Sequence, residues 1–233
     1  QHEWDGKRFG KLKADFKLKE VYELIHKLQP QALIGSNHHL APNPGEDFQM
    51  FEKDLPGKGT KDFATSADDI GNLPLEVCET INGSWGFNLK DRKHKSEKEL
   101  VQYLVKAAGY GSNLLLNVGP MPNGKIQEEH VESLKKIGNW VKQNGQTIYN
   151  TKRGPIAPSD EIASTQNGNI VYIHLLDNKK SEYNIEGFKS KFKKITYLRS
   201  GNKVSIKKSK EGLSIRLDDK EIDHIDTILK MEL

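Results

Sequence analysis

The chain has 233 residues, of which 35% are hydrophobic and 29% are charged, and its formal net charge is +4. This composition is typical of a soluble globular protein, and the length allows one large domain or two of ordinary size. No apolar run approaches the roughly 20 residues that a membrane-spanning helix needs, so we expect no membrane insertion.

The single cysteine, Cys78, excludes an internal disulfide. It lies in an apolar stretch, where a cysteine is most simply a small core residue. Gln1 is not an initiator methionine, and no basic and apolar leader follows it. We therefore expect that a signal peptide is absent or was lost with a missing portion, and the sequence leaves the compartment open.

Helical and strand patterns alternate up to about residue 150. Apolar residues recur at helical spacing from Phe16 to Leu28, and this helix is expected to end at Gln29–Pro30. A short apolar strand over residues 32–35 should follow it. The pattern indicates a helix packed beside a strand, the first piece of an α/β arrangement.

Two further helices are predicted in this part of the chain. Ser96 and Glu99 have the spacing of a capping box, and the helix that they open should close at Gly109 as its C′ residue. A third helix is expected from about Gln127 to Gly145. Strands alternating with crossover helices are typical of a parallel sheet, open or closed.

After Gly154–Pro155 the pattern changes. Short apolar runs are separated by Gly, Asn, Asp and Lys turns, and no helical period appears. This predicts an antiparallel β-sandwich. The runs cover residues 170–176, 194–198, 203–206, 212–217 and 226–231.

Two groups of lysines, within 189–194 and 203–210, give this region a basic appearance. They alternate with apolar residues such as Ile195 and Val204, so we interpret them as the solvated face of strands. No stacking-aromatic module accompanies them, and we therefore expect no nucleic-acid partner.

The most informative segment is Asn113–Gly124, an apolar strand that stops at Asn117 and breaks into a turn with two prolines and two glycines. It fits the last strand of an α/β barrel, where polar groups at the carboxyl end of the strand face the ligand. Two other segments precede it in the chain: Gly45–Glu52, with the sequence GEDFQMFE, and Leu75–Phe87, with the sequence LEVCETINGSWGF.

In this order the three segments resemble the carboxyl-terminal half of the retaining α-L-fucosidase family of glycoside hydrolases, from about Asp15 to the end of the chain. The resemblance implies the second half of a (β/α)8-type barrel over residues 1–150 and a β-sandwich domain over residues 151–233. A complete member would have a comparable length of barrel before residue 1. We therefore expect that the chain alone is inactive.

The resemblance implies removal of terminal L-fucose from glycans by retaining double displacement. Such enzymes need two carboxyl groups about 5 to 5.5 Å apart, one a nucleophile and one an acid/base. The family's acid/base closes a motif Asp-Phe-x-x-x-Glu, which is Asp47–Glu52 here, so Glu52 is the candidate and Glu46 the second choice. Extended geometry would place Glu52, Met50 and Phe48 on one side of the strand.

The nucleophile is an Asp in a Trp-x-Asp-Gly setting in the family, commonly followed after one residue by Trp and an acidic residue. Trp4-Asp5-Gly6 aligns with this in two ways. Either Asp5 is the nucleophile, or Trp4-Asp5 is the trailing pair and the nucleophile lies at or before Gln1. No apolar strand precedes Trp4, which favours the second alignment.

Substrate contacts are implied at two further places. His38 and His39 follow a strand end that supplies a polar sugar contact in the family, sometimes an Arg. The sequence Asn37-His38-His39 departs from that pattern and leaves open which residue takes the role, and either histidine alone fits a structural role as well. Adjacent strand residues point opposite ways, so this pair is not expected to chelate a metal. Trp85 is the candidate for an aromatic wall beside the apolar C5 methyl of fucose, although a Trp packed under a loop fits the sequence equally well.

No cofactor is implied, and the expected partner is a fucosylated oligosaccharide or glycoconjugate. Family resemblance suggests a periplasmic or secreted protein. Two alternatives remain: a carbohydrate-binding module, and an inactive half-barrel remnant with unpaired strand edges. The sequence does not specify the linkage cleaved, the aglycone or the oligomeric state.

Overall fold

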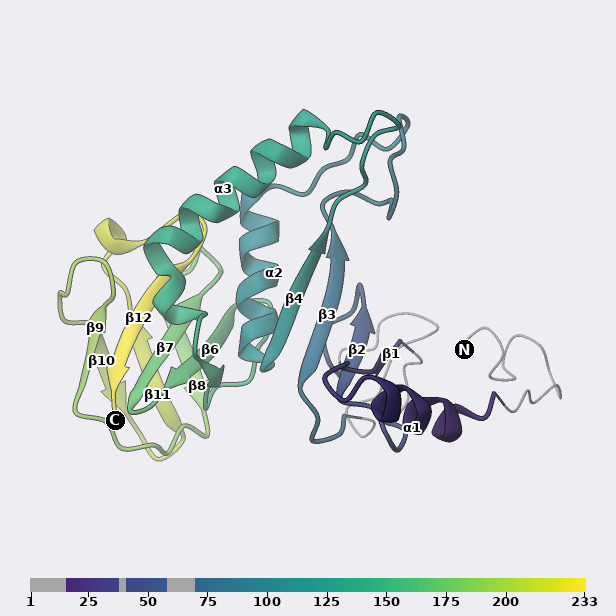
Figure 1. Cartoon of the computed structure of the whole chain (residues 1–233). Helices are drawn as coiled ribbons and strands as arrows, with labels where there is room; N and C mark the ends of the chain where they lie inside the picture. The colour runs from purple at the N-terminus through teal and green to yellow at the C-terminus, as the bar shows by residue number, and fades with distance from the viewer. Residues whose placement is uncertain (1–15, 38–40, 58–69) are drawn as a thin grey trace, which may run out of the picture. The chain divides into compact units, whose positions relative to one another are not determined.

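The computed structural model describes residues 16–37, 41–57 and 70–233, which form an α/β protein with a region of antiparallel sheets (Figure 1). The chain divides into two compact units. The first runs to Glu79 and includes Ser112–Leu116, and the second consists of Thr80–Gly111 and Asn117–Leu233. Within the described ranges, no helix is long and apolar enough to cross a membrane.

A four-stranded sheet belongs to the first unit. The pairs β1–β2 and β2–β3 are parallel, and Figure 1 draws the β3 and β4 arrows in the same direction. The sheet order is β1 (Gly35–Ser36), β2 (Phe48–Glu52), β3 (Leu75–Thr80) and β4 (Ser112–Asn117). The strand expected over 32–35 is wrong in its bounds, because only Gly35 of that range lies in β1.

Side chains alternate along β2 as the extended geometry predicts. Gln49 and Phe51 are buried, whereas Phe48, Met50 and Glu52 are only partly buried. Gln49 accepts a hydrogen bond from the backbone N–H of Gly71 at 3.1 Å, which satisfies its buried amide oxygen. Glu52 therefore lies on the more accessible face of the strand.

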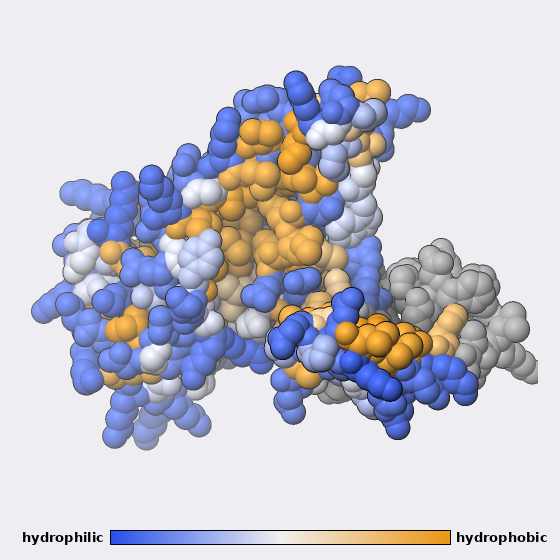
Figure 2. Space-filling view, viewed as in Figure 1, coloured by the Kyte–Doolittle hydropathy of each residue, from blue (hydrophilic) through white to orange (hydrophobic). Residues whose placement is uncertain are grey.

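Helix α1 (Leu18–Leu28) forms where the apolar period predicts it. Its buried residue is Tyr22, while Val21, Leu24 and Leu28 are 42%, 53% and 70% exposed. Figure 2 shows the resulting hydrophobic surface on this helix. The helix is amphipathic, but much of its apolar stripe is not covered by the described residues.

Helices α2 (Glu97–Gly109) and α3 (Glu128–Asn144) agree with the sequence. Ser96 and Glu99 make the predicted capping box, and hydrogen bonds from Ser96 lower the pKa of Glu99. The expectation for Gly109 as C′ residue is wrong. Gly109 is the last residue of α2, and the left-handed position is Gly111, with φ 74°.

Two antiparallel sheets make up the rest of the second unit. The five-stranded sheet has the order β5-β6-β7-β12-β9 and the three-stranded sheet the order β10-β11-β8. Strands β5, β6 and β8 are not apparent from the apolar runs. The bounds are β5 Lys152–Arg153, β6 Ile162–Asn167, β7 Ile170–Leu175, β8 Glu182–Glu186, β9 Lys194–Tyr197, β10 Ser205–Lys208, β11 Gly212–Arg216 and β12 Thr227–Glu232.

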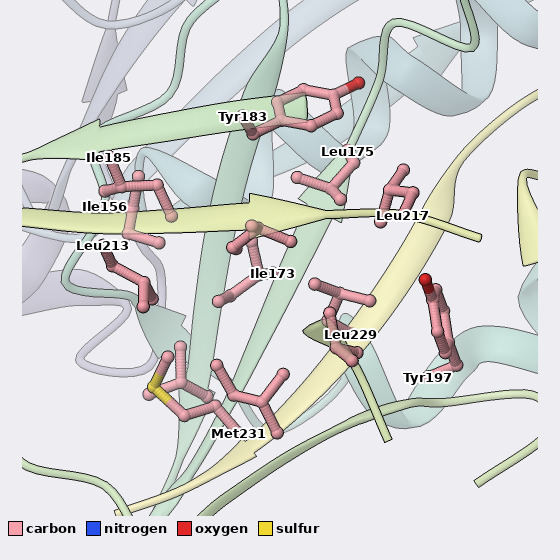
Figure 3. Close-up of a cluster of buried hydrophobic side chains, with 14 residues drawn as sticks. Ile156, Ile173, Leu175, Tyr183, Ile185, Tyr197, Leu213, Leu217, Leu229 and Met231 are labelled. Atoms are coloured by element: carbon pink, nitrogen blue, oxygen red, sulfur yellow. The ribbon is translucent and has the colours of Figure 1, made fainter. Parts of the chain in front are cut away.

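The two antiparallel sheets share one hydrophobic core (Figure 3). Ile173 and Leu229 contribute from the five-stranded sheet and Ile215 from the three-stranded sheet, and each has 0% of its surface exposed. Complete burial of side chains of this size is worth roughly 1.5 to 3 kcal/mol each. This core is the main source of stability in the antiparallel region.

The opposite face of the five-stranded sheet packs against α2 and α3. Val101 and Trp140 from the helices meet Tyr172 of β7 in a second apolar cluster. Within this layer His174 Nδ1 lies 2.6 Å from Asp226 Oδ2, and both side chains are fully buried. Burial raises the pKa of Asp226, while His174 opposes the rise by favouring the ionised carboxylate.

Asp47 ties α1 to the first strands of the parallel sheet. One of its carboxylate oxygens, Oδ2, accepts a hydrogen bond from the backbone N–H of Ile34 at 2.7 Å and lies 2.9 Å from His26 Nε2. The Ile34 hydrogen bond, followed by the His26 contact, lowers the pKa of Asp47. The Asp47 backbone N–H in turn donates to the Ile34 carbonyl at 2.7 Å.

Asp47→Asn should lower the free energy of unfolding, and the loss should depend on pH. A carboxyl with a lowered pKa in the folded state adds stability above its unfolded value of 3.8, and this is lost as the pH falls through the folded pKa. Urea unfolding should therefore show a constant deficit above about pH 5 that shrinks below pH 4. Exposed Asp219→Asn sets the baseline for losing one charge, and a deficit independent of pH would contradict this role.

Candidate active site

Glu52 and Asn37 lie together at the carboxyl edge of the parallel sheet. Glu52 is the last residue of β2, and Asn37 directly follows β1. The Asn37 side chain donates a hydrogen bond from Nδ2 to Glu52 Oε2 at 2.7 Å. Adjacent parallel strands end at the same edge, and this brings the two side chains together across a separation of fifteen residues.

This hydrogen bond orients the Glu52 carboxylate. One oxygen is held by the Asn37 amide, which leaves Oε1 as the atom that can carry or accept a proton. Among the described residues, the buried Asn37 Oδ1 has no hydrogen-bond partner. The Asn37 side chain therefore donates a hydrogen bond through Nδ2, and its Oδ1 can still accept one.

Glu46, the second candidate for the acid/base, is buried and hydrogen-bonded within the first unit. It is 6% exposed and accepts hydrogen bonds from the Tyr22 hydroxyl at 3.2 Å and from the Asn43 backbone N–H at 2.9 Å. The Asn43 side chain adds a third at 3.2 Å. These contacts brace the turn before β2 against α1, which is a structural role.

Cys78 is the cross-strand neighbour of Glu52 in β3. Its thiol donates to the Phe51 carbonyl with a donor–acceptor distance of 3.5 Å. Burial, together with the negative charge of Glu52, raises the pKa of Cys78. Burial and nearby carboxylates therefore favour the neutral thiol, which is the opposite of the environment that activates a cysteine nucleophile.

Trp85 lies in the loop that follows β3, in the second unit, with 37% of its surface exposed. Its backbone carbonyl accepts a hydrogen bond from Asn117 Nδ2 at 2.7 Å. Close by, a Cβ on Gly119 would lie 2.5 Å from the backbone of Gly86 and Phe87. The loops after β3 and β4 are thus in direct backbone contact.

The root of the Trp85 loop is held by Lys95 and Asp91. Lys95 Nζ donates to the Thr80 carbonyl at 2.7 Å, and hydrogen bonds from Ser84 lower the pKa of Asp91.

His94 and His130 meet edge to face, with ring centroids 5.3 Å apart. Burial, with a contribution from His94, lowers the pKa of His130.

Three of the predicted site residues, Asp5, His38 and His39, lie outside the described residues. No group of three or more His, Cys, Asp or Glu side chains in the described part of the chain is placed to hold a metal ion. The sequence leaves Asn37 open as a polar sugar contact, but it does not reveal the hydrogen bond from Asn37 to Glu52. The position of Asn37 at the end of the strand before His38 is the signal that points to it.

Parallel strands with a carboxylate and an amide at their carboxyl edge are typical of α/β proteins that bind ligands at strand ends. A family model described as alpha-L-fucosidase matches residues 2–146 of this chain. The chain belongs to the α-L-fucosidase family.

Curated relatives include the human plasma alpha-L-fucosidase, 31% identical over 161 residues, with 58% of this chain and 34% of the relative covered. The alpha-L-fucosidase of Branchiostoma floridae is 28% identical over 179 residues, covering 65% of this chain and 39% of the relative. The matched part of the chain thus spans little more than a third of the length of these proteins.

Solved structures are similar over almost the whole chain. The alpha-L-fucosidase isoenzyme 1 of Paenibacillus thiaminolyticus has a TM-score of 0.75 and 29% identity, covering 93% of this chain and 53% of its own. The alpha-fucosidase of Thermotoga maritima in complex with fucose has a TM-score of 0.70 and 25% identity, covering 92% and 48%.

Gly119→Ala should destabilise the protein by about 1 to 3 kcal/mol, because the added Cβ meets backbone that cannot move aside as a side chain would. Hydrogen exchange should also accelerate in peptides that cover residues 80–90. Gly138→Ala in α3 is the matched control, since nothing lies within 4 Å of its Cβ position. The control should be neutral or stabilising by up to about 1 kcal/mol. Equal behaviour of the two variants would contradict the loop contact.

Proposed function

We propose that this chain is the carboxyl-terminal part of a retaining α-L-fucosidase that removes terminal L-fucose from glycans. In this proposal residues 1–150 form the second half of a (β/α)8-type barrel, and residues 151–233 form a β-sandwich domain. The parallel order of β1, β2 and β3 supports the first assignment, and the antiparallel pairing after residue 150 supports the second.

The position of Glu52 carries the proposal. Glu52 ends a parallel strand at the edge where such sheets bind ligands, and the Asn37 amide fixes one of its oxygens. As general acid, Glu52 donates a proton to the glycosidic oxygen while a nucleophilic carboxylate bonds to C1 and the bond from C1 to that oxygen breaks. As general base, it then removes a proton from the water that attacks C1 and releases the nucleophile.

The nucleophile is either Asp5 or a residue at or before Gln1. A gene segment upstream of Gln1 that encodes an apolar strand ending in Trp-x-Asp-Gly would select the second possibility. His38 and His39 are proposed as polar contacts to the sugar hydroxyls. Neither step of the double displacement calls for a cofactor, since both are carried by carboxyl groups.

The exposed apolar face of α1 supports a larger barrel around these strands. The apolar side chains of Val21, Leu24 and Leu28 are neighbours on one face of the helix. A contiguous exposed apolar patch of this kind usually marks a surface that contacts another part of a protein. The tyrosines of the antiparallel region give no comparable support to a carbohydrate-binding module. Tyr172, Tyr183 and Tyr197 are buried, with 6%, 5% and 4% of their surface exposed, and cannot serve as a sugar platform.

The test compares this chain with the same chain extended upstream, both on an aryl α-L-fucoside. We expect turnover from the extended protein only. In it, Glu52→Gln should reduce kcat/KM by about 10²- to 10⁴-fold for poor leaving groups, because the proton donor is lost. Azide should partly restore deglycosylation on an activated substrate, since it needs no general base.

Glu46→Gln is the control for the Glu52 experiment. It removes a buried hydrogen-bonded carboxylate and should lower stability without producing azide rescue. If Glu46→Gln shows azide rescue while Glu52→Gln keeps near-normal rates, the acid/base assignment is wrong. Robust turnover by the unextended chain would contradict the split barrel or make Asp5 the nucleophile.

Trp85 is proposed as the wall against the C5 methyl of fucose. Burying one methyl is worth roughly 0.8 kcal/mol, and stripping water from an unpaired C6 hydroxyl costs about 1 to 3 kcal/mol more. In the extended protein, Trp85→Ala should therefore weaken fucose-mimicking inhibitors and narrow the preference for fucose over its 6-hydroxylated analogue. A variant that loses stability but keeps the preference would place Trp85 in the packing of its loop.

A further inference from the structure

The segment 189–210 concentrates positive charge. It contains eight lysines and one arginine and no acidic residue, although the formal net charge of the whole chain is only +4. Figure 2 shows a largely hydrophilic surface where β8, β10 and β11 lie. Like charges that are close together repel one another and make the surrounding surface attractive to anions.

Four of these lysines line a cavity of about 270 Å³ between the segment 188–192 and the turn 208–213. They are Lys189, Lys191, Lys208 and Lys210, and among the described residues that line the cavity none is acidic. The nearby Glu211 is directed to Ser209, whose hydroxyl lies 3.1 Å from its carboxylate. The cavity is therefore lined by four lysines and by no Asp or Glu among the described residues.

Two aromatic rings and Leu213 form the apolar part of this cavity. Phe188 and Phe192 are partly buried against the core of the antiparallel sheets, with ring centroids 6.3 Å apart. Lys208 Nζ lies 3.5 Å from the centroid of the Phe192 ring, a cation–π contact that holds the ammonium at the cavity. The register of β10 explains why Lys208 lies at the cavity. Lys208 is directly opposite the buried Leu213 of β11, so the two side chains lie on the same face of the sheet.

We propose that this lysine cavity, lined by segments 188–192 and 208–213, is a binding site for an anionic polysaccharide that carries sulfate or carboxylate groups. Lysine ammonium groups are compact point charges suited to such anions. The choice of a carbohydrate rests on the proposed glycosidase function.

Nucleic acid is the competing polyanion, and the aromatic geometry disfavours it. Single-stranded nucleic acids are held by rings whose faces are open for base stacking. Here Lys208 lies over the Phe192 face, and both rings are partly buried in the core edge. The site accordingly offers charge without a stacking platform.

The test measures binding of the 233-residue chain to dextran sulfate, polygalacturonate, neutral dextran and oligo-dT at about 0.15 M salt. We expect binding to at least one of the two anionic polysaccharides, none to dextran and weaker binding to oligo-dT. The preferred polysaccharide then identifies sulfate or carboxylate as the recognised group. These polymers contain no fucose, so the result is independent of fucosidase turnover.

Variants of lysines inside and outside the cavity distinguish binding at the cavity from a non-specific effect of positive charge. Lys208→Gln with Lys210→Gln should weaken binding about tenfold and reduce the slope of log K against log salt by roughly one for each ammonium group removed. Lys207→Gln is the matched control, because Lys207 is on the same strand but opposite Ser214, outside the cavity. It should change binding by less than about twofold.

Three results would overturn the proposal. The first is no binding to either anionic polysaccharide, and the second is oligo-dT binding as tight as theirs. The third is a loss of affinity per removed charge that is the same for Lys207→Gln as for the double variant of Lys208 and Lys210. This result would indicate a non-specific basic surface. None of these outcomes bears on hydrolysis by Glu52, and loss of fucosidase activity would not alter the binding result.

Discussion

Parallel pairing of β1, β2 and β3 is the constraint on which the candidate site depends. Because parallel strands end at one edge, Asn37 and Glu52 meet although neither is near the other in sequence. In an antiparallel pair the same two residues would lie at opposite edges. The register is equally strict, since a slip of one residue in β2 would exchange Glu52 for the buried Phe51.

The helices could be predicted from the sequence because each carries its own signal. The apolar period of α1 and the Ser96–Glu99 capping box of α2 are local, and local patterns survive without knowledge of the fold. The error at Gly109 has a tertiary cause. A Cβ there would lie 2.9 Å from Pro158 Cγ, so that glycine permits close packing while Gly111 provides the left-handed turn.

Strand β6 could not be predicted, because two of its three buried residues, Ser164 and Thr165, are polar. Ser164 Oγ is hydrogen-bonded to the backbone of Ile156, and Thr165 Oγ1 donates to the Thr147 carbonyl at 2.6 Å. Hydroxyls satisfied in this way can be buried at little cost, yet they leave no apolar alternation to detect. The same limit applies to Asn37 and Glu52, whose partnership depends on strand pairing, although a motif alone was enough to single out Glu52.

The two compact units are interleaved along the chain, and this affects how the protein must fold. Ser112–Leu116 belong to the first unit but follow α2, which belongs to the second. The ribosome synthesises the chain from its amino end. Strand β3 therefore cannot pair with its neighbour β4 until all of α2 has been synthesised. The parallel sheet therefore cannot be completed before synthesis has passed well into the second unit, and β3 remains an open edge during that interval.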